Sequence, residues 1–210
     1  MIVVAIVFTI VCVLALAVLL IAECAERADL RQKAKPLASA CFVVVGLVLG
    51  VNGWIATGLV LGAIGDVLLM YPSDRAFLAG LVAFLGGHVA YVVAFTRVVP
   101  IDAWPHAPIV LIALPIVAAA GALAWLWRGL GSMRIPVIAY VAVITTMVIG
   151  ALVCERAIGW HVATAGALLF FASDLSVARD RFVAHDFVNR AWGLPAYYVA
   201  QLLFAWSVYR

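Results

Sequence analysis

Eight apolar runs follow one another along the chain, and each approaches the length of a helix that crosses a bilayer. Such a crossing needs about 20 apolar residues. The runs are residues 2–22, 36–51, 54–70, 76–96, 107–127, 135–154, 160–178 and 190–208. The second and third runs are short, and Asn52 and Gly53 between them predict a tight helical hairpin. The pattern predicts an all-α integral membrane protein, a bundle of eight transmembrane helices.

The composition agrees with this fold class. Apolar residues make up 68% of the 210 residues and charged residues only 11%, whereas soluble domains contain about 25% charged residues. A water-soluble globule, a disordered chain and a nucleic-acid-binding protein are therefore excluded. The connections between runs are too short for a further domain, so we expect residues 1–210 to form a single eight-helix transmembrane domain.

The basic residues predict how the bundle is oriented. Ten lie in the odd-numbered connections and three in the even-numbered connections or at the C-terminus. Because basic residues are enriched in cytoplasmic connections, the odd-numbered connections should be cytoplasmic and both termini non-cytoplasmic. The ten are Arg27, Arg31, Lys33, Lys35, Arg75, Arg128, Arg134, Arg179, Arg181 and Arg190, and the three are Arg97, Arg156 and Arg210.

Two acidic residues lie inside apolar runs, Asp66 in the third and Asp174 in the seventh. Each costs about 2.5–3.5 kcal/mol to place at the centre of a bilayer, and such residues usually face the bundle interior at a functional site. Odd-numbered spans run in the same direction, so the two carboxylates should share one depth near the cytoplasmic side. The alternative is that each aspartate simply reaches the headgroup layer from a helix end.

A short echo surrounds the two aspartates. The spacing Gly58-x7-Asp66 recurs as Gly166-x7-Asp174, 108 residues and four spans later. Because four is an even number, the two halves would be parallel, and the sequence therefore suggests a 4+4 parallel repeat.

Polar and small residues in neighbouring runs are candidates for the same pocket. Gly58 and Gly62 have the spacing that lets another helix approach closely. Lys35 precedes Pro36, and proline suits the first turn of the second helix. The ammonium group of Lys35 could meet a lipid phosphate or could serve only to set the topology. A lone buried histidine such as His88 is often a core residue. The substrate-binding or orienting candidates are Lys35, His88, Tyr91, Tyr197, Tyr198 and Gln201.

Two carboxylates in a poorly hydrated pocket oppose each other's ionisation, so one stays protonated near neutral pH while the other is charged. This pair supplies a general acid beside a general base, as in the cleavage of acetal-like bonds. The sequence contains no G-x-S-x-G or H-E-x-x-H motif. Only His88 and His185 are histidines of the cytoplasmic side, so a three-histidine zinc site is not expected there.

Several short motifs together resemble one family of membrane proteins. They are Lys35-Pro36-Leu37, Gly65-Asp66 followed by Leu68-Leu69, Phe84-x3-His88-x2-Tyr91, Leu168-x4-Ser173-Asp174, and Tyr197-Tyr198-x2-Ala200-Gln201. In this order and spacing, over residues 35 to about 203, they resemble the YhhN-type proteins, a group that includes the lysoplasmalogenases.

The resemblance implies hydrolysis of the vinyl ether bond of lysoplasmalogens to a fatty aldehyde and glycerophosphocholine or glycerophosphoethanolamine. Asp66 and Asp174 would be the catalytic residues, and neither a metal nor an organic cofactor would be needed. Lys35 would attract the lipid phosphate, while His88 and Tyr91 would orient the water or the headgroup. The expected partners are the lysophospholipid and membrane lipids. The expected location is a bacterial inner (cell) membrane, with the active site toward the cytoplasmic leaflet.

Two other functions compete with hydrolysis. Buried acidic residues and a possible repeat would also suit a proton-coupled transporter of a small or lipid-like substrate, although the spans show little Gly or Pro interruption near mid-membrane. A structural membrane partner would leave the buried aspartates unexplained. Turnover in detergent separates an enzyme from a carrier, because transport needs two compartments.

Overall fold

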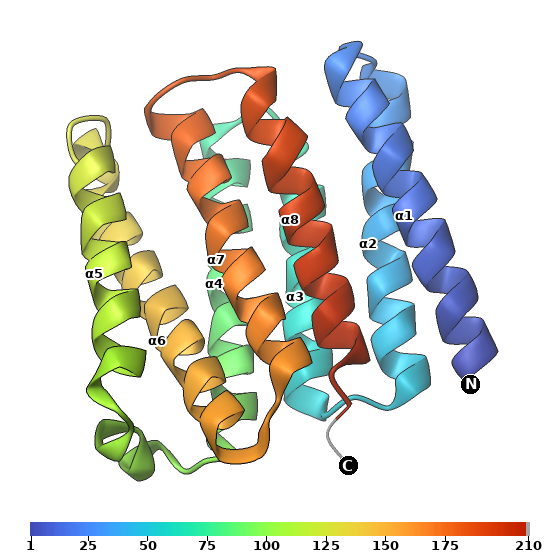
Figure 1. The fold of residues 1–210 in the computed structure, drawn as a ribbon. Helices are drawn as coiled ribbons and strands as arrows, with labels where there is room; N and C mark the ends of the chain where they lie inside the picture. Colours follow the sequence, from blue (N-terminus) through green and yellow to red (C-terminus); the bar gives the residue numbers. More distant parts are fainter. Residues whose placement is uncertain (209–210) are drawn as a thin grey trace.

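The computed structural model describes residues 1–208, which form an up-and-down bundle of α-helices (Figure 1). The helices are α1 (Ile2–Cys24), α2 (Ala28–Leu49), α3 (Gly53–Leu68), α4 (Asp74–Thr96), α5 (Ile109–Leu126), α6 (Arg134–Ile158), α7 (His161–Phe182) and α8 (Phe187–Trp206). Two short 3-10 helices, η1 (Ile101–His106) and η2 (Gly131–Met133), precede α5 and α6. The prediction of an all-helical chain is confirmed for the described residues.

Six of the helices, α1, α2, α4, α5, α6 and α7, are long and apolar enough to cross a membrane. The α3 helix is apolar but has only 16 residues. The α8 helix is continuous, but its apolar sequence is interrupted by polar side chains, among them Asn189, Arg190 and Gln201. A count of eight membrane crossings therefore stays a prediction.

The connections after odd-numbered helices all lie at one end of the bundle, at the top in Figure 1. The connections after even-numbered helices lie at the other end, together with the start of α1. The ten basic residues counted above thus gather toward one end. Their cytoplasmic location, the position of both termini and the 4+4 parallel repeat stay predictions, and Arg210 lies outside the described residues.

The second helix differs from its prediction. The α2 helix begins at Ala28, eight residues before the apolar run, so Pro36 lies inside the helix and not in its first turn. An apolar run marks only the part of a helix that hydrocarbon surrounds, and the polar residues 28–35 continue the same helix beyond it. This extension places Arg31 and Lys35 on successive turns of one helical face.

The predicted hairpin between α2 and α3 is confirmed. Gly50 ends α2 with a left-handed φ of 72°, which glycine adopts without a steric penalty. The Asn52 side chain then accepts a hydrogen bond of 2.8 Å from the backbone N–H of Trp54 at the start of α3.

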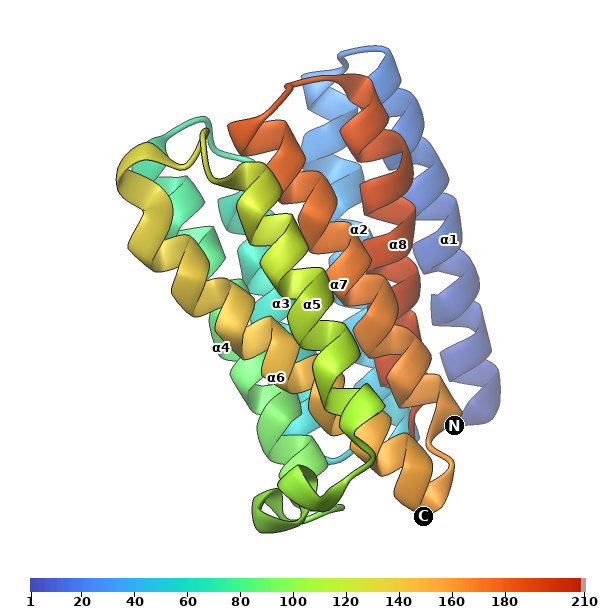
Figure 2. The ribbon, with the colours of Figure 1, turned by 60° about the vertical axis from the view of Figure 1, so that its left-hand side comes forward.

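The helices pack so that α3 lies among α2, α4 and α8, while α7 packs against α6 and α8. At the two edges, α1 packs on α2 and α8, and α5 packs on α6 and α7 (Figure 2). The edge helices expose large apolar side chains, such as Leu14 on α1 and Val117 on α5, of which 61% and 66% is exposed. Hydrocarbon is the natural environment for such faces.

Candidate active site

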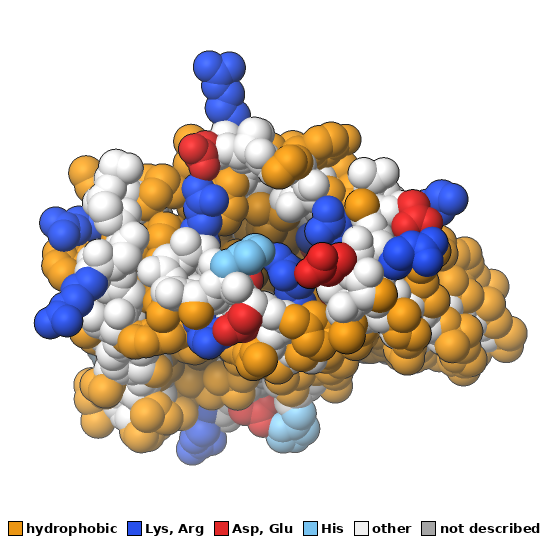
Figure 3. All heavy atoms as spheres, turned by 90° about the horizontal axis from the view of Figure 1, so that it is seen from above, with side chains coloured by type: hydrophobic (Ala, Val, Ile, Leu, Met, Phe, Trp, Pro, Cys, Tyr) orange, Lys and Arg blue, Asp and Glu red, His pale blue; other side chains and the backbone are white. Residues whose placement is uncertain are grey.

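A cavity of about 810 Å³ opens at the end of the bundle that carries the odd-numbered connections. Its wall includes Asp66 from α3 and Asp174 from α7. Seen from this end, the hollow is surrounded by side chains of both charges (Figure 3). The two aspartates, 108 residues apart in the chain, therefore face one common chamber.

Asp66 is buried and has two close partners on α2. The ammonium nitrogen of Lys35 lies 3.5 Å from Oδ1, and the hydroxyl of Ser39 donates to Oδ2 over 2.7 Å. The Tyr198 hydroxyl lies 3.2 Å from the Ser39 hydroxyl and donates to the carbonyl of Lys35 over 3.3 Å. Both oxygens of Asp66 thus have a positively polarised neighbour, which favours the charged carboxylate.

A chain of three side chains approaches Asp66 from the other side. Tyr91 on α4 donates to the amide oxygen of Gln201 over 2.7 Å. The Gln201 amide nitrogen then donates to the Tyr197 hydroxyl over 3.1 Å. Because Tyr197 accepts this bond, its own proton is free to interact with Asp66, which lies beside it. The chain fixes Tyr197 from behind and leaves its donor at the carboxylate.

Asp174 lies in a different cluster, formed with α4 and α6. The Tyr140 hydroxyl donates to Oδ2 of Asp174 over 2.8 Å. The His88 Nε2 lies 3.1 Å from the same oxygen and 2.9 Å from the Tyr140 hydroxyl. His88 is fully buried, whereas 18% of the Asp174 side chain is exposed to the cavity. Two groups therefore hold one oxygen of Asp174 and leave Oδ1 without a hydrogen-bond partner among the described residues.

The second ring nitrogen of His88 indicates which nitrogen of the ring is the donor. Nδ1 is buried and has no hydrogen-bond partner within residues 1–208. A buried N–H without an acceptor is costly, because no hydrogen bond offsets the free energy of removing the donor from water. We therefore assign the proton to Nε2, where the oxygens of Asp174 and Tyr140 accept it. His88 thus acts as a donor toward Asp174.

An aromatic layer separates the two clusters. The Phe84 ring packs edge-on against Tyr197 beside Asp66, with ring centroids 5.7 Å apart. Phe170 packs against His88 on the other side, at 4.5 Å, and against Tyr197 at 5.3 Å. These rings hold the partners of both carboxylates in place and make the floor between them apolar.

Glycines on α3 make room for this arrangement. A Cβ at Gly58 would overlap the Tyr91 ring, and a Cβ at Gly62 would overlap the amide nitrogen of Gln201. A Cβ at Gly65 would lie 2.7 Å from the Phe84 ring. The small-residue face predicted for α3 is thus present, and it accommodates side chains of α4 and α8 beside Asp66.

The structure brings together most of the candidate residues, but in two groups. Lys35, Tyr197, Tyr198, Gln201 and Tyr91 belong to the Asp66 side. His88 alone of the candidates contacts Asp174, although it shares a helix with Tyr91. Within residues 1–208, no three His, Cys, Asp or Glu side chains are grouped as a metal site.

Two contributors were missed by the sequence analysis. Ser39 and Tyr140 make the shortest hydrogen bonds to Asp66 and Asp174. Each has a hydroxyl group within a mainly apolar run, and this was the signal by which the sequence could have identified it. Their partners lie 27 and 34 residues away, and only the rotation of the helices brings them together.

The model of the YhhN family matches residues 4–208. This chain belongs to the YhhN family. The motifs that suggested the resemblance are those that carry the two clusters.

Curated relatives of this YhhN protein bear one enzyme name. The lysoplasmalogenase of Mycobacterium bovis is 33% identical over 156 residues, which are 71% of this chain and 58% of the relative. The lysoplasmalogenase TMEM86A of Bos taurus is 33% identical over 162 residues, 73% of this chain and 64% of the relative. For the lysoplasmalogenase TMEM86B of Homo sapiens the identity is 34% over 158 residues, 72% and 62% of the two chains.

The matched regions thus span about three fifths of the length of these relatives. No solved structure matches this member of the family.

Proposed function

We propose that the protein is a lysoplasmalogenase-type hydrolase. It would cleave the vinyl ether bond of lysoplasmalogens to a fatty aldehyde and glycerophosphocholine or glycerophosphoethanolamine. The observation that carries the proposal is the shared cavity, in which Asp66 and Asp174 face one chamber at the end of an apolar bundle. The enzyme name borne by the relatives agrees with it.

The cavity suits a lipid with one chain. Leu81, Ile144, Phe171 and Leu175 line part of its wall and offer apolar contacts to the alkenyl chain. Charged side chains lie toward the open rim, where the headgroup would remain in contact with water. The basic residues at this end favour the cytoplasmic leaflet as the source of the substrate.

We assign different roles to the two aspartates. Lys35 and Ser39 favour the charged form of Asp66, so Asp66 stabilises the cation and takes a proton from water. Hydrogen-bond donors surround both carboxyl groups, so we assign the second role by access to the substrate: 18% of the Asp174 side chain is exposed to the cavity, against 3% for Asp66. A proton on Oδ1 of Asp174, the oxygen that Tyr140 and His88 do not contact, would face the cavity. Asp174 is therefore the general acid in this proposal.

The reaction then proceeds in two stages. Asp174 donates its proton to the β-carbon of the vinyl ether, the π electrons form the new C–H bond, and an oxocarbenium ion results. Water adds to the α-carbon and transfers a proton to Asp66. The hemiacetal collapses when Asp66 protonates the glycerol oxygen, the C–O bond breaks and Asp174 takes the hydroxyl proton. Both carboxyl groups regain their starting states, and one water is consumed.

The test uses the purified protein in detergent with lysoplasmenylethanolamine, its saturated 1-alkyl analogue and an ester lysolipid. Aldehyde release is measured by mass spectrometry. We expect aldehyde from the vinyl ether alone, because protonation needs the double bond. Equal hydrolysis of the ester lysolipid would contradict this specificity, and uptake into proteoliposomes without turnover would favour a carrier.

The variants Asp66→Asn and Asp174→Asn test the roles of the carboxylates. Each should lower turnover by about 10²–10⁴-fold, the usual contribution of a general acid or base. Asp102→Asn is the control, because Asp102 is exposed in η1 at the opposite end of the bundle. Near-normal turnover in both active-site variants would refute the carboxylate mechanism.

A further inference from the structure

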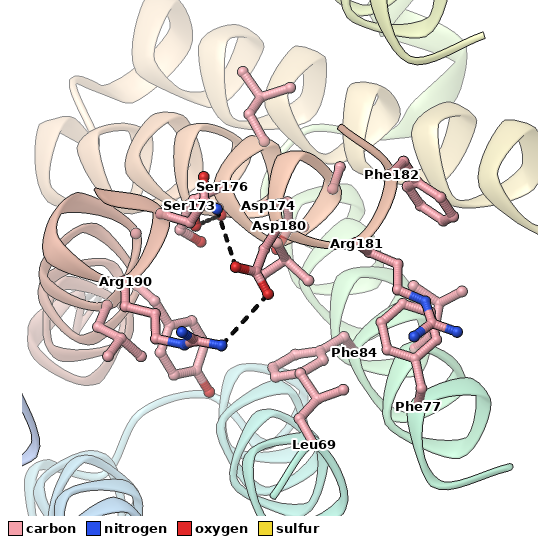
Figure 4. A pocket seen from close by; sticks show the side chains of 18 of the residues that line it. Leu69, Phe77, Phe84, Ser173, Asp174, Ser176, Asp180, Arg181, Phe182 and Arg190 are labelled. Atoms are coloured by element: carbon pink, nitrogen blue, oxygen red, sulfur yellow. Dashed lines mark hydrogen bonds and ion pairs between the residues drawn. The ribbon is translucent and has the colours of Figure 1, made fainter. Parts of the chain in front are cut away.

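A ring of mixed charges surrounds the rim of the cavity, above the two aspartates. Arg31 on α2 and Arg190 on α8 both approach Glu23 at the end of α1, at 3.8 and 3.3 Å. Arg190 also reaches Asp180 on α7, at 3.6 Å (Figure 4). All four residues line the cavity, and none of them is used by the proposed chemistry.

The two arginines of the rim retain unused hydrogen-bond donors. The distances from their guanidinium nitrogens to the carboxylate oxygens exceed the about 2.7–2.9 Å of a strong charge-assisted hydrogen bond. The Nε of Arg31 is buried and has no hydrogen-bond partner within the described chain. A guanidinium carries five N–H donors in a fork that matches phosphate. The rim arginines are therefore held near carboxylates but are not saturated by them.

A third arginine at the same end provides the contrast. Arg179 makes contacts of 3.0 Å to both oxygens of Asp186 and a further one to Asn189. Arg179 is absent from the residues that line the cavity. Its partners hold it as part of the α7–α8 connection, whereas Arg31 and Arg190 face the chamber with donors to spare.

The carboxylates of the rim are equally significant. Five acidic and four basic side chains line the cavity, so its wall carries no net excess of positive charge. A purely anionic ligand would meet Glu23 and Asp180 as like charges and would be repelled. A ligand with an anion and a cation a short distance apart would satisfy both signs.

The depth of the rim matches the length of a glycerol backbone. Arg31 lies one helical turn above Lys35 on α2, a rise of about 6 Å, and Lys35 contacts Asp66. Five single bonds separate the ether oxygen of a lysoplasmalogen from its phosphorus, a span of roughly 6 Å. A vinyl ether at the level of Asp66 would therefore place its phosphate at the level of Arg31.

We propose that this rim is a headgroup site for zwitterionic lysophospholipids, in which Arg31 and Arg190 bind the phosphate while Glu23 and Asp180 bind the cationic amine. The inference rests on the proposed function and extends it, because it makes the headgroup a determinant of specificity. Lys35, which is paired with Asp66, contributes to the carboxylate cluster and not to phosphate binding in this scheme.

The test compares three alkenyl lipids of one chain length: lysoplasmenylethanolamine, 1-alkenylglycerol 3-phosphate and 1-alkenylglycerol. Arg190→Gln should raise KM about tenfold for the two phosphate-containing lipids and leave that for 1-alkenylglycerol unchanged. Glu23→Gln should reduce the preference for the ethanolamine lipid over the phosphate lipid by a similar factor. Equal effects on all three lipids, or unchanged preferences, would overturn the headgroup site.

Matched controls at the same end are Arg75→Gln and Glu26→Gln. Both residues are exposed and lie outside the cavity wall. They change the net charge by the same amount and should leave all three KM values unchanged. If these controls reproduced the shifts of the rim variants, the effect would be one of overall charge and the proposal would fail.

A binding measurement separates this inference from the hydrolase function. The saturated 1-alkyl-glycerophosphoethanolamine should bind the wild-type protein in detergent at least about tenfold more tightly than 1-alkylglycerol, and Arg190→Gln should abolish the difference. Absence of aldehyde from every lipid would refute the hydrolase. Equal binding of both alkyl lipids by the wild-type protein would refute the headgroup site.

Discussion

The ammonium nitrogen of Lys35 lies 3.5 Å from Oδ1 of Asp66, and only 12% and 3% of the two side chains is exposed. This pair joins α2 to the short α3. Burying either charge alone would be costly, because neither could be solvated by water. Each residue therefore offsets part of the cost of burying the other.

Replacing the lysine tests this dependence. Lys35→Met should lower the melting temperature in detergent, since breaking a buried pair costs about 3–5 kcal/mol, and it should lower turnover more than tenfold. The double variant Lys35→Met/Asp66→Asn should melt at a higher temperature than Lys35→Met alone. Lys33→Met is the control, because Lys33 is exposed on the same helix. Additive losses in the double variant would contradict the coupling.

Tyr140 should influence turnover through Asp174. Tyr140→Phe removes the hydroxyl that donates to Oδ2 over 2.8 Å and keeps the aromatic packing against His88. We expect kcat to fall about 10- to 100-fold with little change in KM, because the hydroxyl stabilises the carboxylate that forms when Asp174 gives up its proton, and a charge-assisted hydrogen bond contributes about 1.5–3 kcal/mol. The pH–rate profile should also change its shape.

Thr145→Val serves as the control for Tyr140→Phe. Thr145 lies on the same helix and is also buried, and within residues 1–208 its hydroxyl bonds only to the carbonyl of Val141 on its own helix. It should retain kcat and the wild-type pH profile. A Tyr140→Phe profile that coincided with the wild-type profile would show that the hydroxyl does not act on Asp174.

The small-residue face of α3 gives a prediction about packing. A Cβ at Gly62 would overlap Gln201 and lie 3.1 Å from the Tyr197 hydroxyl. Gly62→Ala should therefore destabilise the fold by about 1–3 kcal/mol and lower turnover by displacing Tyr197. Gly121→Ala on α5, where no atom lies within 4 Å, should leave the melting temperature unchanged or raise it. Thermal melting in detergent measures both, and equal melting temperatures would contradict the packing argument.

The α7–α8 connection should make stability depend on pH. The hydrogen bonds from Arg179 hold the pKa of Asp186 below its usual range. A carboxyl group whose pKa is lower in the folded state contributes its full stabilisation of the fold at pH values above its unfolded-state pKa. This contribution is lost as the pH falls through the folded-state pKa. Asp186→Asn keeps an N-cap side chain for α8 but loses the charge.

The wild-type protein should therefore melt at a higher temperature than Asp186→Asn at neutral pH, and the difference should shrink below about pH 4. Arg179→Gln should show the same loss of pH dependence. A difference in melting temperature that stayed constant down to pH 3 would mean that the charge of Asp186 is not the cause.

Much of the fold could be predicted because the signal is local. A run of apolar residues shows where a helix lies in hydrocarbon, and the inward-facing positions of Asp66 and Asp174 follow from the cost of exposing a carboxylate to lipid. The start of α2 could not be predicted in this way, because polar residues can continue a helix into the headgroup layer without any apolar signal.

The partners of the carboxylates were harder to predict for a different reason. Tyr198 approaches Ser39 across 159 residues of sequence, and Tyr91 bonds Gln201 across 110. Such contacts depend on how each helix is rotated about its axis. His88 and Tyr91 share one face of α4, because three residues leave them only about 60° apart around the helix axis. They lie nearly one turn apart along it, and there His88 meets α6 and α7 whereas Tyr91 meets α8.

The short α3 helix also bears on how the reactants meet. Its 16 residues span about 24 Å, against about 30 Å for the hydrocarbon core. Asp66 lies two residues before the end of this helix. If α3 crosses the membrane, as its apolar run predicts, the bilayer would have to thin or the neighbouring polar layer to dip at that point. Water and the glycerol region of a lipid coexist at such a depth, so the proposed hydrolysis would require neither a dedicated water channel nor the extraction of the lipid from its leaflet.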